Sequence, residues 1–330
     1  MAINLMALTP HQVSRDLSGY ITYVYGQPKV GKTSLVTQFP GVLLLACEKG
    51  YSTIPGIIVQ DVTSWTDIRQ IVRELKKPEV KERFSTVAID TIDVAASYCD
   101  KWVCNKLEIE ALGDGGWTKN GWSVYKKEME DVFRTITNLG YALVFISHEK
   151  DKEFTRQDGS KFNKIIPTAP TSANEIVKAM ADIYTYATMN ENGGDRKLIF
   201  RCLDNTIDCG CRFKYMPLEV ELSYKALVDA MNEAIDKEAS EHDNKYVTDA
   251  REPAPATAIE YDYDALMTEF NDIAGKLMGK DGPYYGPRIT QVVSKILGKG
   301  KKVSDTSREQ AEFIYLIVNE LKDEFGSELA

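Results

Sequence analysis

One eight-residue segment near the start of the chain constrains its fold more than any other feature. It is a complete G-x-x-x-x-G-K-T phosphate-binding loop, and its residues are Gly26, Gln27, Pro28, Lys29, Val30, Gly31, Lys32 and Thr33. A β-branched and aromatic run, Ile21–Tyr25, precedes the loop and predicts a buried strand. Ser34–Phe39 continues it as a helix that stops at Pro40. A strand, this loop and a helix are the setting in which the motif binds a nucleoside triphosphate.

Each residue type in the loop has a physical reason. Glycine at positions 26 and 31 lets backbone N–H groups turn toward phosphate oxygens, because no side chain stands in the way. The helix beginning near Lys32 presents free N–H groups and a positive dipole end to the same anion, so Ser34 is also expected at the nucleotide. The Lys32 ammonium should reach the β- and γ-phosphates, and the Thr33 hydroxyl should ligate Mg²⁺. The predicted cofactors are therefore ATP and Mg²⁺.

The composition is that of a globular protein with room for one large and one small domain. The chain has 330 residues, of which 43% are apolar and 27% charged. It has neither the run of about 18 apolar residues that spans a membrane nor an N-terminal basic region typical of a signal peptide. We expect a cytoplasmic location, the host cytoplasm if the protein is phage-encoded, and no membrane partner.

Charge and cysteine content limit the partners further. The net charge of −9 argues against a protein that coats nucleic acid with its whole surface, but it allows a local basic groove. The six cysteines are expected to be reduced thiols in this compartment. Cys209 and Cys211, with Cys202 nearby, offer half of a zinc site, although their spacing is not that of a standard zinc ribbon.

Strand-like apolar runs alternate with helical periodicity from about residue 20 to 235. This alternation predicts an α/β fold with a doubly wound, mostly parallel sheet. Strands are expected at residues 21–25, 42–46, 86–90 and 141–147, with two more at 182–187 and 197–201, antiparallel at the sheet edge. Helices are expected after Ser64, which forms a capping pattern with Asp67, and from about Trp122 to Leu139.

The predicted domains are a core at residues 1–238, a linker at 239–256 and a small helical domain at 257–330. Periodicity disappears in the linker, which ends in a Pro-Ala-Pro-Ala stretch. Three amphipathic segments follow it. Their expected buried residues are Leu266, Phe270, Ile273 and Leu277; Ile289, Val292, Val293 and Ile296; and Phe313, Ile314, Ile317 and Leu321.

Polar residues at the ends of the predicted strands are the candidates for chemistry. Asp90 ends an apolar strand and is expected to hold Mg²⁺ as the Walker B carboxylate. Glu48 and Asp93 compete for the role of general base. Ser147 and His148 end another strand, where they can touch the γ-phosphate or its water; the alternative is a strand-end pair with a purely structural role.

Three segments suit a single-stranded nucleic acid. A glycine-rich loop carries Trp117 and Trp122, which can stack on unpaired bases or pack under the loop. Residues 149–164 interleave basic and aromatic side chains, which also suits a plain solvated hairpin turned at Asp158 and Gly159. Residues 276–302 are basic against a single acid, Asp281; a protein-docking surface is the alternative. The candidate DNA-binding residues are Trp117, Trp122, Lys150, Lys152, Arg156, Lys161, Lys299, Lys301 and Lys302.

With these residues in place, residues 18–235 resemble the RecA-like P-loop ATPases, and most closely the phage-type proteins that act in single-strand annealing or recombination mediation. The resemblance implies that Glu48 activates water, that the Gly-Trp loop and the segment after His148 bind DNA, and that the chain forms a ring or filament. Arg212 or Lys214 would complete the site of a neighbouring subunit. The usual glutamine or asparagine of the sensor strand is replaced by Ser147 and His148.

The expected function is therefore an ATPase, stimulated by DNA, that acts on single-stranded DNA in phage recombination or annealing. Single-stranded DNA and a homo-oligomer are the expected partners, and the resemblance allows a single-strand-binding protein as another. The alternatives are a replicative helicase or packaging motor, and a small-molecule kinase or P-loop ATPase that does not act on DNA.

Overall fold

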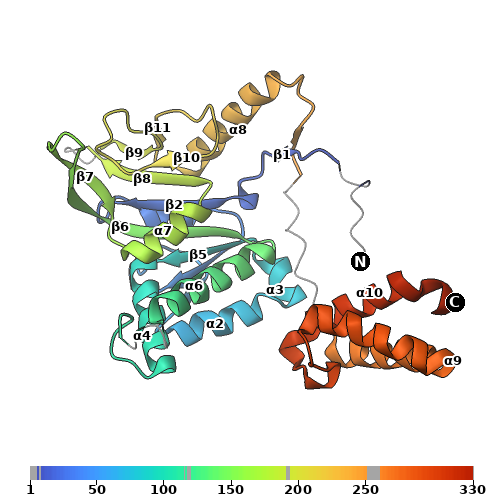
Figure 1. Ribbon diagram of the computed structural model, residues 1–330. Helices are drawn as coiled ribbons and strands as arrows, with labels where there is room; N and C mark the ends of the chain where they lie inside the picture. Colours follow the sequence, from blue (N-terminus) through green and yellow to red (C-terminus); the bar gives the residue numbers. More distant parts are fainter. Residues whose placement is uncertain are drawn as a thin grey trace. The chain divides into compact units, whose positions relative to one another are not determined.

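A computed structural model describes residues 6, 9–114, 116, 120–190, 194–250 and 261–329 of the chain. The chain divides into two compact units, Met1–Thr257 and Ala258–Ala330 (Figure 1). Each unit is described by itself. No helix among the described residues is both long and apolar enough to cross a membrane.

The first unit is built on a ten-stranded sheet, counted over the described residues. The strands in chain order are β2 (Ile21–Gly26), β3 (Val42–Ala46), β4 (Val59–Asp61), β5 (Thr86–Asp90), β6 (Ala142–Thr155), β7 (Lys161–Pro167), β8 (Ile183–Met189), β9 (Arg196–Ile199), β10 (Gly210–Cys211) and β11 (Glu219–Glu221). Their spatial order is β11-β9-β8-β2-β6-β5-β3-β4, with β10 paired to β8 and β7 to β6. The strands from β8 to β4 run parallel, whereas β7, β9, β10 and β11 pair antiparallel with their neighbours. The predicted α/β fold with a mostly parallel sheet is confirmed.

Helices cover both faces of this sheet (Figure 1). One face carries α2 (Trp65–Glu74), α4 (Ile92–Leu107), α6 (Gly121–Asn138) and α7 (Thr171–Met180), and the other carries α1 (Lys32–Val36) and α8 (Tyr224–Ser240). The remaining short elements are η2 (Leu17–Gly19), α3 (Pro78–Arg83) and the parallel pair β1 (Val13–Ser14) and β12 (Val247–Thr248). Because both faces are covered, β3 and the interior of β5 (residues 87–89) are continuous apolar runs, as is typical of central parallel strands.

Three expectations are corrected by the topology. Strand β8 is not at the sheet edge and pairs parallel with β2, whereas β9 runs antiparallel to β8 and is itself covered by β11. Strand β6 continues past residue 147 to Thr155 and forms a hairpin with β7. The predicted linker begins too early, because α8 extends to Ser240 and β12 pairs with β1. Residues 251–256 of that linker lie outside the described residues.

The second unit is helical, with a core of its own. Helix α9 (Tyr263–Leu297) contains the first two predicted segments, separated by a kink at Asp281, and α10 (Ala311–Leu329) contains the third; η3 (Val303–Asp305) and η4 (Arg308–Gln310) lie between them. The expected apolar faces meet in this core with one exception. Phe313 is exposed, because it lies about 100° around the helix from the buried Ile314.

Packing in the first unit can be tested at Phe133, which is fully buried and makes edge-on ring contacts with Trp65 and Phe145. Phe133→Ala removes these contacts and leaves a cavity, so the free energy of unfolding of this unit should fall by about 3–5 kcal/mol. Urea unfolding followed by circular dichroism measures the loss. Leu203→Ala is the control, because Leu203 is exposed and its loss should cost less than about 0.5 kcal/mol. Equal losses would contradict the packing.

Candidate nucleotide site

The phosphate-binding loop connects β2 to α1 at the carboxyl edge of the sheet. Gly26 has φ +151° and lies against β8, so a Cβ added there would stand 2.0 Å from the carbonyl oxygen of Ala187. Gly31 caps α1 with φ +110°, a region that favours glycine. The Gln27 side chain accepts a hydrogen bond from the N–H of Met189 at 3.1 Å. Strand β8 therefore holds the first half of the loop in place.

Lys32 is buried at the centre of the loop, with 6% of its surface exposed. Its Nζ donates to the carbonyl oxygens of Gly26 and Gln27 at 2.7 and 2.8 Å. Burial lowers the pKa of Lys32, while the nearby carboxylate of Asp90 acts to raise it. Two carbonyl groups of the phosphate-binding loop therefore hold the Lys32 ammonium at the centre of that loop, where the motif requires a positive charge.

Thr33 and Asp90 meet across two elements. The Thr33 hydroxyl donates to Asp90 Oδ2 at 2.7 Å, which joins the start of α1 to the end of β5. Burial raises the pKa of Asp90, partly offset by this hydrogen bond. A hydroxyl and a carboxylate oxygen are ligands that suit Mg²⁺, and a bound cation would favour the ionised carboxylate. These two side chains fit the predicted metal-binding role.

Glu48 follows β3 and faces the same space. Its Oε1 accepts from the Thr91 hydroxyl at 2.8 Å, and its Oε2 lies 3.3 Å from His148 Nε2. About 38% of the Glu48 side chain is exposed, which leaves the carboxylate open to a water molecule. A cavity of about 380 Å³ is lined by loop residues together with Glu48, Asp90 and His148. This cavity is the candidate nucleotide site.

The predicted pair Ser147 and His148 separates onto opposite faces of β6, because side chains alternate along a strand. His148 lines the cavity, but Ser147 is fully buried and donates to Asp93 Oδ1 at 3.1 Å. Asp93 also accepts from Thr168. The structure therefore does not bring Ser147 to the nucleotide, and it ties Asp93 to neighbouring side chains while leaving Glu48 in the cavity.

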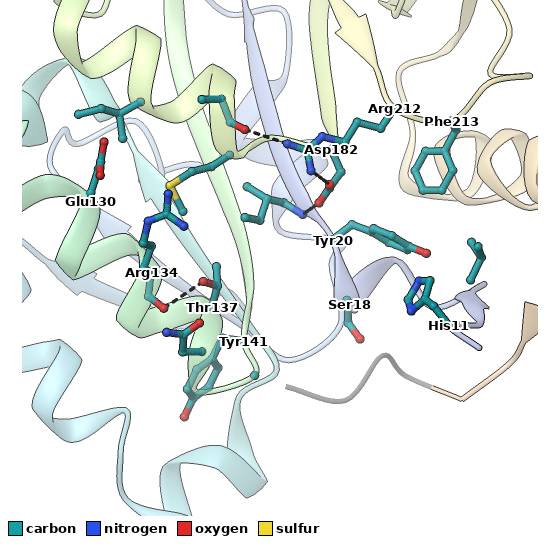
Figure 2. A pocket seen from close by; sticks show the side chains of 18 of the residues that line it. His11, Ser18, Tyr20, Glu130, Arg134, Thr137, Tyr141, Asp182, Arg212 and Phe213 are labelled. Carbon is teal, nitrogen blue, oxygen red and sulfur yellow. Dashed lines mark hydrogen bonds and ion pairs between the residues drawn. The ribbon is translucent and has the colours of Figure 1, made fainter. Parts of the chain in front are cut away.

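The two basic residues assigned to a neighbouring subunit are already paired. Arg212 donates to Asp182 at 3.0 Å and to the Ala179 carbonyl at 2.8 Å, in a pocket of about 770 Å³ at the amino edge of the sheet (Figure 2). Lys214 pairs with Glu241 at 2.8 Å. Arg212 therefore lies at the edge opposite the phosphate loop of its own chain.

The cysteines and tryptophans have simpler positions. All six thiols are free, and no group of three or more metal-ligating side chains comes together in the described part of the chain. Trp117 lies outside the described residues. Trp122 lies in α6, where it is 49% exposed and touches Tyr125 edge-on, so it is not fully packed away.

One residue near the loop has no signal in the sequence. Arg196, the first residue of β9, places its Nη1 3.2 Å from where a Cβ on Gly31 would stand. It belongs to no motif and is remote from the loop in sequence, so only the folded sheet shows the proximity.

The comparison with known proteins agrees with this geometry. A sequence profile described as "AAA domain" matches residues 18–207. The chain belongs to this family of P-loop NTPases. It is also similar to the SPbeta prophage-derived uncharacterized protein YorG of Bacillus subtilis (strain 168), at 27% identity over 330 residues, covering 98% of this chain and 99% of the relative. The AAA domain is a P-loop ATPase domain, and it accounts for the loop, the sheet edge and the acids around them.

The arrangement in this AAA domain divides the work of hydrolysis. Mg²⁺, when bound, neutralises phosphate charge and would be held by Thr33 and Asp90. The loop N–H groups and Lys32 are placed where they would bind and orient the phosphates. The carboxylate of Glu48, which contacts Thr91 and His148, would accept a proton from the attacking water.

Lys32→Ala should abolish ATP hydrolysis by the AAA domain and most binding of Mg·ATP, because it removes the buried ammonium at the β- and γ-phosphates. Phosphate release and calorimetric titration measure the two effects. Lys76→Ala, at an exposed lysine after α2, is the control and should behave as wild type. Near-normal turnover in the Lys32 variant would show that hydrolysis occurs elsewhere.

Glu48→Gln should leave Mg·ATP bound but slow hydrolysis about 10²- to 10⁴-fold, because the amide keeps the shape of the side chain and cannot accept a proton. Asp93→Asn should slow hydrolysis less, because Asp93 accepts hydrogen bonds from Ser147 and Thr168. Single-turnover assays at saturating ATP separate chemistry from binding. A larger loss in the Asp93 variant would make Asp93 the base.

Proposed function

We propose that this protein is a RecA-like ATPase that binds single-stranded DNA in phage recombination or annealing, with DNA stimulating its hydrolysis of ATP. The host cytoplasm is the proposed location. The observation that carries the proposal is a basic and aromatic hairpin face on the strand that also carries His148 into the nucleotide cavity. The prophage origin of the similar protein from Bacillus subtilis supports a role in phage biology.

The hairpin β6–β7 separates its charges by face. Because side chains alternate, Lys150, Lys152 and Phe154 share one face of β6, while Glu149, Asp151 and Glu153 share the other. Across the ladder, Lys152 lies opposite Lys164 and Phe154 opposite Phe162. Lys164 is paired with Asp208 at 3.1 Å, so Lys150 and Lys152 supply the positive charge of this aromatic face, although the chain as a whole is acidic.

The aromatic pair on this face suits unpaired bases. The Phe154 and Phe162 rings are 5.8 Å apart, with Lys152 over the first ring at 5.3 Å and Arg156 over the second at 4.3 Å. Neither Lys152 nor Arg156 forms an ion pair with a described residue, so no carboxylate neutralises the two charges that would attract phosphates. Stacking on aromatic rings contributes about 1–3 kcal/mol per base, and it is tolerant of sequence.

The other predicted DNA-binding residues contribute unequally. Lys161 lies opposite Thr155 and pairs with Glu153 at 2.8 Å, so it belongs to the acidic face. In the second unit, the basic character expected of residues 276–302 is reduced, because Arg288 and Lys295 pair with Glu324 and Glu320 of α10. Three exposed lysines remain near the turn at Gly298 and Gly300, and we propose them as a secondary contact: Lys299, Lys301 and Lys302.

The proposed partner besides DNA is a second copy of the chain, in a ring or filament. Arg212 lies at the amino edge of the sheet and the phosphate loop at the carboxyl edge, so a head-to-tail assembly can bring the two edges of neighbouring copies together. A gel-shift with labelled single-stranded and duplex DNA, with and without ATP, tests the function. Failure to bind either DNA would reject it in favour of a kinase or a P-loop ATPase that does not use DNA. ATP-driven strand separation would favour a helicase.

Replacing both Lys152 and Arg156 with Ala should weaken single-stranded DNA binding at least tenfold and reduce its salt dependence. Each lost phosphate contact lowers the slope of log affinity against log salt by about 0.7. Basal ATPase without DNA should be unchanged, because neither residue lines the nucleotide cavity.

The matched control for this variant is Lys161→Ala, which removes a cation from the opposite face of the same hairpin. Fluorescence anisotropy over a salt series, read alongside the ATPase rate with and without DNA, measures all three proteins. If the control weakens DNA binding as much as the double variant, the basic face is not the binding surface.

A further inference from the structure

The phosphate loop has a second wall, formed by a free arginine. Arg196 is exposed, and its guanidinium makes no ion pair or side-chain hydrogen bond with any residue that the structure describes. Nevertheless its Nη1 lies 3.2 Å from where a Cβ on Gly31 would stand. An unpaired cation against the loop, and outside the cavity that holds Lys32 and Glu48, has no part in the mechanism described so far.

Leu222 completes this wall. Its N–H donates to the Arg196 carbonyl at 2.9 Å, and its Cδ2 lies 3.5 Å from the same point beside Gly31. Arg196 and Leu222 lie two residues from Leu198 and Val220, respectively, so each shares a face of the sheet with that residue. Leu198 and Val220 pack in the core on the face that α1 covers, and both side chains therefore point to that face. A cavity of about 330 Å³ opens beside them, lined by residues 194–197, 221 and 222.

The sheet order determines which end of a nucleotide would reach this wall. The proposed Mg²⁺ ligand Asp90 ends β5 and the proposed base Glu48 follows β3, and both strands lie on one side of the loop strand β2. The γ-phosphate belongs on that side, because the water and the metal act on it. The nucleoside end must then leave the loop toward the other side, where β8 and β9 lie.

We propose that Arg196 and Leu222 form the nucleoside subsite of this ATPase. The guanidinium lies flat on one face of the base, and Leu222 supplies an apolar contact beside it. A planar guanidinium is weakly hydrated and stacks well on aromatic rings. Among the other charged side chains of the cavity wall, Lys197 pairs with Glu219 and Asp195 accepts from Asn190. Glu221 lies on the opposite face of its strand from Leu222. This inference rests on the nucleotide binding in the proposed function.

The experiment compares a nucleotide with its phosphates alone. Calorimetry measures the affinity of Mg·ATP and of Mg·tripolyphosphate for the full chain and for Arg196→Ala. The variant should bind Mg·ATP about 3- to 30-fold more weakly, the range of a cation–π contact. Its affinity for Mg·tripolyphosphate should stay within about twofold of wild type. Lys225→Ala is the charge-matched control, at an exposed lysine paired with Asp229 on α8, and should bind both ligands as wild type does.

The outcomes separate the subsite from the proposed function. Unchanged Mg·ATP affinity in the Arg196 variant overturns the subsite and leaves the ATPase intact. An equal loss for both ligands also overturns it, because Arg196 would then contact phosphate. If wild type binds neither ligand, the nucleotide-binding function fails, and the subsite fails with it. Unaltered circular dichroism and thermal unfolding confirm that the exposed substitution leaves the fold unchanged.

Discussion

The buried ammonium of Lys32 is the charge on which the rest of this site depends. A charged group almost removed from water needs compensation, and the loop provides it through the carbonyls of Gly26 and Gln27. Those carbonyls are available because the loop turns at its glycines and is held against Ala187 of β8. The conformation of the loop therefore determines where its cation lies. Both depend on β8, a strand that supplies no candidate catalytic group.

The same burial explains why a divalent cation suits this site. Asp90 and Glu48 both face the cavity that Lys32 lines, so two carboxylates stand against one buried ammonium. A triphosphate adds more negative charge at the same place. Thr33 and Asp90 already lie within hydrogen-bonding distance, with oxygens suited to Mg²⁺, so a bound ion would relieve the repulsion that the acids create. The acids then serve chemistry without preventing binding.

Local patterns predicted the parts of the fold that depend on local physics. Strands β3 and β5 and helix α6 were placed within about a residue, because buried parallel strands and amphipathic helices leave periodic signals. Long-range pairing leaves none. The parallel pairing of β8 with β2, the approach of Arg196 to Gly31 and the neutralisation of Arg288 by α10 all join distant parts of the chain. Ser147 does not line the cavity with His148 for a different reason: adjacent residues of a strand face opposite sides of the sheet.

Strand β6 links the two halves of the proposed function. It lies between β2 and β5, so His148 at its point of exit from the sheet faces Glu48. Beyond that point the strand continues without a break into the hairpin. Lys150 and Lys152 follow His148 at alternate positions, on the face shared with Phe154. On the proposed function, a shift of the hairpin on binding DNA would be transmitted along β6 to His148, which contacts the proposed base Glu48. Coupling of this kind needs no other element, because the proposed DNA-binding residues and the contact with Glu48 lie on one strand.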